Sequence, residues 1–200
     1  MTEDQLIDVE QQVLDKACSA MGELFRVLIG RRCQVTLYLI RDNSCFIWAC
    51  NEQNVDRQRW VEQSFLISKD SNTRFQRILE LIENKKKPIY FSRDILKENQ
   101  YHDSLPDAKS FYRTVIVVPV KCTISADSGK QESRILGFLT LDSKSPGRLN
   151  DDYHAEFLAA FADQIFNFIS VMRSYFRHTE SVNVSVAVED PGPLGIISKL

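Results

Sequence analysis

The chain has 200 residues, of which 44% are hydrophobic and 26% charged, a balance that suits one globular domain of roughly 150 residues with flanking elements. Its formal net charge of −2 at pH 7 argues against a nucleic-acid-binding protein, which needs a basic surface. No apolar run approaches the roughly 18 residues of a membrane span and the acidic N-terminus is not a signal peptide, so we expect a cytoplasmic protein with no membrane partner.

A long amphipathic helix is predicted for residues 1–30. Thr2 and Gln5 form a capping box at its start. One apolar stripe then continues to Gly30, a residue typical of helix C-termini. A single small sheet cannot cover a helix of this length. We therefore expect its outer half to pack on another helix, either the C-terminal one or the copy in a homodimer.

The middle of the chain predicts strands and one short helix. Alternating side chains over 33–51 indicate a hairpin, and 60–67 has the composition of a third strand. Apolar residues at helical spacing indicate a helix over 75–82, with Asp70 or Ser71 as its cap. This helix is expected to lie near the candidate binding residues.

The second half of the chain carries the most apolar strands. After a short strand at 89–91 and a polar surface loop at 92–110, residues 111–122 predict a buried strand. Pro119 indicates a break in the hydrogen-bond ladder of that strand. Residues 134–172 predict a second buried strand, a Pro-Gly turn and a long amphipathic helix.

The order of these elements predicts an α+β fold. The connections are too short for several parallel crossovers, so we expect an antiparallel sheet with both terminal helices on one face. Beyond about His178, valines alternate with other residues, which fits either disorder or an added strand, and we expect a flexible tail at 179–200. The predicted divisions are an N-terminal packing or dimerisation helix at 1–30, the main domain at 31–178, and this tail.

Several motifs occur in a recognisable order. A Ser-Arg-Asp turn at 92–94 precedes the strand 112–120, in which an arginine and a later proline flank an apolar run. The segment 137–144, followed by a Pro-Gly turn, and the helical sequence 162–165 complete the set. In this order, over about residues 15–172, the chain resembles GAF domains, which are PAS-like sensory domains.

The resemblance implies a six-stranded antiparallel sheet, with the N- and C-terminal helices packed on one face and a short helix plus loops over the other. Members of the family bind cyclic nucleotides, tetrapyrroles, amino acids or haem in a pocket between sheet and front helix, or leave it empty. Many dimerise through the terminal helices. The Asn-Lys-Phe-Asp-Glu motif of cyclic-nucleotide-binding members and the Cys-His pair of bilin-binding members are absent. The resemblance therefore leaves the ligand open, with a small molecule or cyclic nucleotide as the candidate.

A binding site is predicted at the start of the short helix. Exposed amides and hydroxyl groups there can hold an anionic group, and aromatic residues can form the walls. The predicted ligand-binding residues are Phe65, Ser71, Asn72, Thr73, Phe75, Tyr101, Tyr112, Arg113 and Thr114. The alternative is structural: Ser71 only caps the helix, and Phe75 belongs to the core. Arg74 is expected in solvent rather than on a phosphate.

The case for catalysis is poor. Asp142 and Ser143 with His154 could suggest a hydrolytic trio, but the sequence has no nucleophile elbow, P-loop or zinc-protease motif. The five cysteines are Cys18, Cys33, Cys45, Cys50 and Cys122. They form no CxxC pair and show no zinc-ligand spacing, so we expect reduced thiols, no metal site and no enzymatic activity. Two of them lie five residues apart on one strand and should face opposite sides of it.

Two functions remain. In the first, a non-enzymatic sensory module binds a small molecule in front of the sheet and signals through terminal-helix contacts to an unidentified partner protein. In the second, the pocket is filled and the protein is a dimeric interaction platform. If Phe65, Phe75, Tyr101 and Tyr112 fill the space, no ligand fits. If they line it, a cavity on the order of a few hundred cubic ångströms is expected.

Overall fold

The computed structural model describes residues 2–51, 64–68, 73–99, 101–102, 112–125, 131–150 and 152–187. Its elements are α1 (Glu3–Ile29), β1 (Gln34–Arg41), β2 (Ser44–Cys50), β3 (Ser64–Leu66), α3 (Thr73–Glu83), β4 (Tyr90–Ser92), the 3-10 helix η1 (Ile95–Lys97), β5 (Thr114–Ser125), β6 (Gln131–Ser143) and α5 (Tyr153–Ala187). The hairpin and the short helix expected from the sequence are both present. Within the expected third strand at 60–67, residues 64–66 form β3, while residues 60–63 lie outside the described part of the chain.

The strands form a six-stranded sheet in the order β3-β2-β1-β6-β5-β4, with every neighbouring pair antiparallel. β5 and β6 pair along their length, from Thr114 opposite Ser143 to Ser125 opposite Gln131. The other edge of β6 pairs with β1. The predicted antiparallel α+β fold is therefore confirmed.

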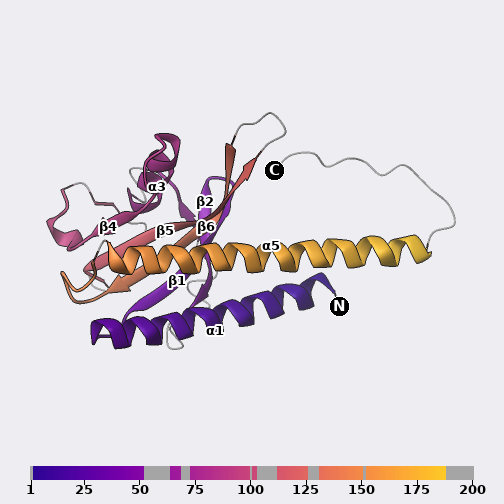
Figure 1. Ribbon diagram of the computed structural model, residues 1–200, viewed down its shortest axis with the longest axis horizontal. Coiled ribbons are helices and arrows are strands. Elements are labelled where there is room, and N and C mark those ends of the chain that lie inside the picture. Colours follow the sequence, from indigo (N-terminus) through magenta and orange to yellow (C-terminus); the bar gives the residue numbers. More distant parts are fainter. Residues whose placement is uncertain are drawn as a thin grey trace.

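Helices cover both faces of this sheet, α1 and α5 on one face and α3 on the other (Figure 1). The two long helices run antiparallel beside each other, and the second half of α5 extends beyond the sheet (Figure 1). Alternate strand residues point toward them and form an aliphatic core, because successive side chains of a strand face opposite sides. Buried members of this core include Leu14, Met21, Phe25, Val35, Leu37, Ile116, Val118, Leu139, Leu141, Leu158, Ile165 and Ile169.

A second core lies between the sheet and α3, and we call it the front cluster. Val115 and Val117 of β5 point into it, while Ile116 and Val118 point to the back. Its buried members are Tyr38, Cys45, Ile47, Phe65, Phe75, Ile78, Tyr90, Ile95, Tyr101, Tyr112, Val115, Val117 and Phe138. The near-continuous apolar runs of β5 and β6 are thus explained, because both faces of the sheet are buried.

The caps of α1 match the sequence prediction. The Gln5 backbone N–H donates to Thr2 Oγ1 at 3.3 Å, and the Thr2 N–H donates to Gln5 Oε1 at 2.9 Å, which completes the capping box. At the other end Gly30 has φ 73° and donates its N–H to the Arg26 carbonyl oxygen at 2.9 Å. Glycine suits this left-handed position because it has no Cβ.

The sequence predicted a break in the hydrogen-bond ladder at Pro119, but β5 continues through this residue. Pro119 lies opposite Phe138 within a continuous β5, and the register shifts one residue later, between Val120 and Lys121. β4 pairs only with Val115–Val117, so it ends before the proline. A missing N–H is tolerated where a strand has a neighbour on one side only.

The helix α5 continues past His178 to Ala187, beyond the residue 179 at which a flexible tail is expected from the sequence. Alternating valines suggested extended or disordered chain. However, adding residues to an existing helix needs no new nucleus, and β-branched residues lower helix propensity only slightly. Residues 188–200 lie outside the described part of the chain, so the rest of the tail prediction stays a prediction.

By length and composition, the segment Tyr153–Tyr175 of α5 could cross a membrane. In this structure one face of that segment packs on the sheet instead. Ala155, Leu158, Ala162 and Ile169 are all buried in the back core. The same pattern is common in the core helices of globular domains.

Gly137 of β6 gives a test of the central pairing, because a Cβ built on it would lie 1.8 Å from the Tyr38 carbonyl oxygen. That oxygen belongs to the backbone of β1 and cannot move aside. We expect Gly137→Ala to lower the free energy of unfolding by about 3 kcal/mol or more through overpacking. Gly30→Ala is the control: no atom lies within 4 Å of its Cβ, and its positive φ costs about 1 kcal/mol. Urea unfolding measures both, and equal losses would contradict the close approach.

Candidate functional site

A buried arginine lies in the front cluster where the sequence predicted a ligand. Arg74, the second residue of α3, is only 1% exposed. Its guanidinium carbon lies 5.6 Å from the ring centre of Tyr38, 4.8 Å from that of Phe75 and 5.3 Å from that of Tyr112. Rings at these distances stabilise a cation through their negative faces. The prediction that Arg74 is solvated is therefore wrong.

A carboxylate of the sheet supplies the counter-charge for Arg74. Its Nη1 lies 3.8 Å from Oδ1 of Asp142, a buried residue of β6. Its Nη2 donates to the Tyr38 hydroxyl at 3.4 Å. Thr140 on the same face donates to Asp142 Oδ2 at 3.3 Å. Burial of an ion pair is tolerated when such additional hydrogen bonds accompany it.

The predicted aromatic walls pack on one another and on the sheet. Phe75 stacks on Phe138 with ring centres 4.6 Å apart, and Phe65 makes an edge contact with Tyr38 at 5.9 Å. The hydroxyls of Tyr101 and Tyr112 are 3.1 Å apart. All four predicted aromatic residues are buried in the front cluster. Together with Arg74 they occupy the space between the sheet and α3.

The start of α3 is tied to the loop that follows η1. The Thr73 N–H donates to the His102 carbonyl oxygen at 3.1 Å, and the His102 N–H donates to Thr73 Oγ1 at 3.0 Å. These groups were predicted to hold an anion, but here they bind the protein itself. Ser71 and Asn72, the other polar groups predicted there, lie outside the described residues.

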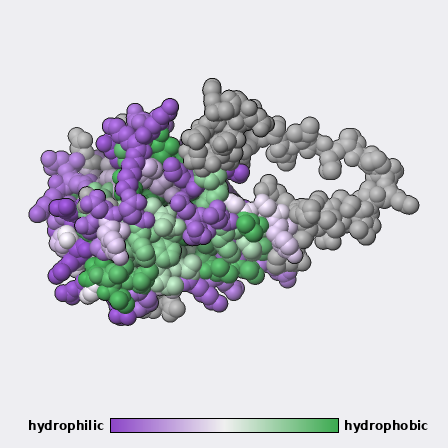
Figure 2. All heavy atoms as spheres, in the orientation of Figure 1, coloured by the Kyte–Doolittle hydropathy of each residue, from purple (hydrophilic) through white to green (hydrophobic). Residues whose placement is uncertain are grey.

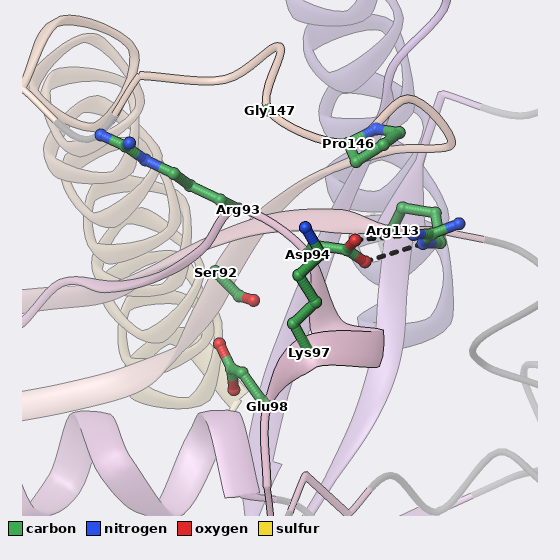
Figure 3. A pocket seen from close by; sticks show the side chains of 8 residues that line it. All are labelled: Ser92, Arg93, Asp94, Lys97, Glu98, Arg113, Pro146 and Gly147. Atoms are coloured by element: carbon green, nitrogen blue, oxygen red, sulfur yellow. Dashed lines mark hydrogen bonds and ion pairs between the residues drawn. The ribbon is translucent and has the colours of Figure 1, made fainter.

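Arg113 lies away from the front cluster and lines a cavity of about 680 Å³ at the edge of the sheet (Figure 3). Thr114 does not line this cavity, but its hydroxyl binds the carbonyl oxygen of Arg93, which does. Arg113 donates to both carboxylate oxygens of Asp94, at 2.8 and 2.6 Å. These bonds to the Arg113 guanidinium hold the pKa of Asp94 below its usual value. The residues that line the cavity are Ser92, Arg93, Asp94, Lys97, Glu98, Arg113, Pro146 and Gly147. We call it the edge cavity.

Thr114 joins the two loops that form the walls of the edge cavity. Its buried hydroxyl lies 2.9 Å from the carbonyl oxygens of both Arg93 and Ser145, and it accepts the Gly147 N–H at 3.1 Å. Gly147 N–H also lies 3.0 Å from the Arg93 carbonyl oxygen. The turn after β4 and the loop before α5 are thereby held together. The sequence offered one signal for this cavity, the Ser-Arg-Asp turn at 92–94.

The residues considered for catalysis are on opposite faces of the sheet. Asp142 points to Arg74 in front, whereas His154 packs against Phe25 of the back core, with ring centres 6.1 Å apart. His154 Nδ1 accepts the Asn150 N–H at 2.8 Å, and burial lowers the pKa of this histidine. The hydrolytic trio is therefore not assembled.

The prediction that the two cysteines of β2 face opposite sides is wrong, because the register of β1 and β2 shifts between Leu37 and Tyr38. Cys45 belongs to the front cluster, and Cys50 follows Ala49 of the back core, so its side chain also points to the front. The Cys50 backbone N–H donates to Asp15 of α1 at 3.1 Å. Burial raises the pKa of the Cys18 thiol, and raises that of Cys33 to about 11. Both thiols are protonated at neutral pH, and a protonated thiol is a poor nucleophile. Among the described residues, no group of three or more His, Cys, Asp or Glu could hold a metal ion.

No family model matches this sequence, and no curated protein matches it. Solved structures do match. The GAF domain of PixJ from Thermosynechococcus elongatus, in its blue-light absorbing form, is 15% identical, with a TM-score of 0.57 over 94% of this chain and 100% of that one. The GAF domain of an Acinetobacter phosphoenolpyruvate-protein phosphotransferase is 15% identical, with a TM-score of 0.51 over 88% of this chain and 99% of that one.

A third similar structure is that of an enzyme. The type II free methionine-R-sulfoxide reductase from Thermoplasma acidophilum is 15% identical, with a TM-score of 0.50 over 82% of this chain and 96% of that one. At these identities the likeness shows the fold alone, since one fold carries many functions. The GAF-like fold that the sequence motifs implied is thus confirmed.

The buried pair of Arg74 and Asp142 gives a second test. Asp142→Asn keeps the volume but leaves the guanidinium without its nearby carboxylate, so we expect a loss of about 3 kcal/mol in the free energy of unfolding. Arg74→Met/Asp142→Asn removes both charges and should cost less than the sum of the two single changes. Urea unfolding of the parent, Arg74→Met, Asp142→Asn and the double variant measures the coupling free energy between the two residues. Additive losses would show that the pair does not interact.

The pair of Arg113 and Asp94 predicts a pH dependence. The folded pKa of Asp94 is lowered, so its contribution is present above the ordinary carboxyl pKa of about 3.9 and is lost as pH falls through the folded value. The stability difference between the parent and Arg113→Gln should therefore shrink on acidification. Arg26→Gln, which breaks the exposed pair with Glu23, should show almost no such change. Urea unfolding from neutral to acidic pH measures both, and parallel curves for the two variants would contradict this role of Asp94.

Proposed function

We propose that this chain, which has the fold of a GAF domain, is a non-enzymatic regulatory module that forms a homodimer through α1 and α5 and presents the paired helices to a partner protein. One observation carries the proposal. Large apolar side chains on both long helices are exposed, and Figure 2 shows apolar residues gathered in a band along them. They are Ile7, Val9, Val13, Val27, Leu28, Tyr153, Val171 and Tyr175.

The exposure of this band is unusual for a monomer. Val171 and Tyr175, on the part of α5 that leaves the sheet, are 67% and 63% exposed. Val9 and Val13, on the outer half of α1, are each 41% exposed. Contiguous apolar surface of this kind marks protein interaction sites, and long helices with apolar stripes bury them by packing on further helices. A second copy supplies two such helices.

An ion pair supports a fixed arrangement of the helices within one copy. Glu10 of α1 is buried, and its Oε1 lies 3.5 Å from Nη2 of Arg173 on α5. A charge buried at a helix contact favours one register over others, since any shift leaves it without a counter-ion. The two helices therefore offer a defined surface rather than two independent ones.

The front cluster supports the platform function over a sensor that holds its ligand between sheet and α3. Phe65, Phe75, Tyr101 and Tyr112 pack together around Arg74, and a ligand in that space would have to displace them. Opening a packed core costs several kcal/mol before any ligand contact forms, roughly the cost of truncating one large core side chain. A small-molecule or cyclic-nucleotide ligand at this place is therefore the less favoured function.

Sedimentation velocity at micromolar concentration tests the dimer. We expect the parent to sediment as a dimer, and Val171→Glu to weaken association by about tenfold or more, because it buries an unpaired charge at the contact. Leu66→Glu is the control, since Leu66 is half exposed on β3, a strand at the edge of the sheet rather than on either long helix, and should leave the dimer unchanged. A monomeric parent, or equal effects of the two variants, would overturn the proposal.

A further inference from the structure

We propose that the edge cavity binds the phosphate group of a small phosphorylated molecule, held by Arg93, Lys97 and the hydroxyl of Ser92. This site is separate from the front cluster and from the helices of the proposed dimer. Its volume of about 680 Å³ lies within the range of roughly 300–1,000 Å³ that small-molecule sites occupy. That volume exceeds what a phosphate group needs, so it has room for an organic part of the ligand.

The first argument is the charge of the lining. Three cations, Arg93, Lys97 and Arg113, face two carboxylates, Asp94 and Glu98, so the lining carries a net charge of +1. Both carboxylates are already bound by the protein. Asp94 accepts two hydrogen bonds from Arg113, and Glu98 accepts one from the Tyr90 hydroxyl at 2.5 Å.

Arg93 and Lys97, the remaining cations of the lining, form no such hydrogen bonds to a carboxylate among the described residues. Among the described residues, neither Arg93 nor Lys97 takes part in an ion pair within 4.0 Å, and both side chains are exposed. Figure 3 shows them on different sides of the cavity, with Arg93 extending away from Lys97. Long exposed side chains of this kind can turn over the opening when an anion enters.

The second argument is the hydroxyl of Ser92. This residue is 2% exposed, and its Oγ has no hydrogen-bond partner. Figure 3 shows the Oγ directed toward the side of the cavity where Lys97 and Glu98 lie. A buried hydroxyl without a partner costs on the order of 1–3 kcal/mol, so a ligand oxygen that accepts its proton recovers that loss.

The arrangement of donors favours phosphate over carboxylate. A planar carboxylate is bound best by one guanidinium in a parallel fork, but the guanidinium of Arg113 already binds Asp94 in that way. The donors that remain come from three separate positions: the end of β4, the turn after it, and η1. A tetrahedral group with oxygens in several directions suits donors that are spread in this way.

The walls are also fixed before a ligand arrives. Thr114 binds the turn at Arg93 and the loop at Ser145 and Gly147 at once. Ligand binding therefore loses no conformational entropy by ordering those two loops. Only the exposed side chains of Arg93 and Lys97 lose conformational freedom.

Amide NMR shifts during titration with inorganic phosphate at constant ionic strength test the site. We expect saturable shifts at residues 92–98, 113 and 147. Lys97→Gln should raise the Kd about tenfold, the loss of one charge-assisted hydrogen bond. Lys16→Gln removes an equal charge from the exposed surface of α1 and should leave the Kd unchanged. Titration with malonate, a dicarboxylate, should give much weaker binding.

Ser92→Ala separates binding from folding. It removes a buried hydroxyl that lacks a partner, so the Tm of the free protein should stay the same or rise, while the Kd for phosphate should increase. A lower Tm with an unchanged Kd would show that Ser92 is structural. Absence of shifts at the cavity, equal effects of Lys97→Gln and Lys16→Gln, or equally tight binding of malonate would overturn the phosphate site.

Discussion

The pairing of β5 with β6 is the constraint on which the rest of the structure depends. The two strands carry apolar side chains on both faces, so their pairing creates two separate surfaces that need cover. Gly137 allows β6 to approach β1 closely on its other edge. Because side chains alternate, a shift of one residue would exchange the residues of the two cores. The register therefore fixes the aliphatic back and the aromatic front together.

The back and front faces of the sheet are covered in different ways, and this difference decides which surfaces stay exposed. The back is covered by two helices that are longer than the sheet, so apolar surface remains along them after the core is complete. The front is closed by α3 and by side chains that pack around Arg74, whose charge is met by Asp142 and by aromatic rings. A buried cation of this kind stabilises only the packed state, since opening the cluster would separate it from those rings. Among the described residues, the exposed surfaces on which the two proposals rest are thus the long helices and the edge of the sheet.

Much of this architecture follows from the sequence, because it rests on periodicity and local signals. Thr2 and Gly30 mark the ends of α1 correctly, and the apolar runs of β5 and β6 predict a sheet buried on both faces. Arg74 was misjudged because a charged residue beside Phe75 is normally solvated, and its carboxylate partner comes from a distant strand. The position of Arg113 could not be predicted for the same reason, because no local pattern shows that Asp94 holds it at the edge cavity. Local patterns report which face a residue occupies, but not which distant side chain meets it there.

The edge cavity and the long helices are connected through one loop. Pro146 and Gly147 line the cavity, and the same loop leads into α5 at Tyr153. Thr114 binds this loop to the turn after β4, so a ligand that moves Arg93 acts on a segment that is already joined to the start of the helix. A ligand changes the helix arrangement only by the difference between its affinities for two such arrangements. Coupling between the two sites therefore requires that the loop has two positions, and that the cations at the cavity bind better in one of them.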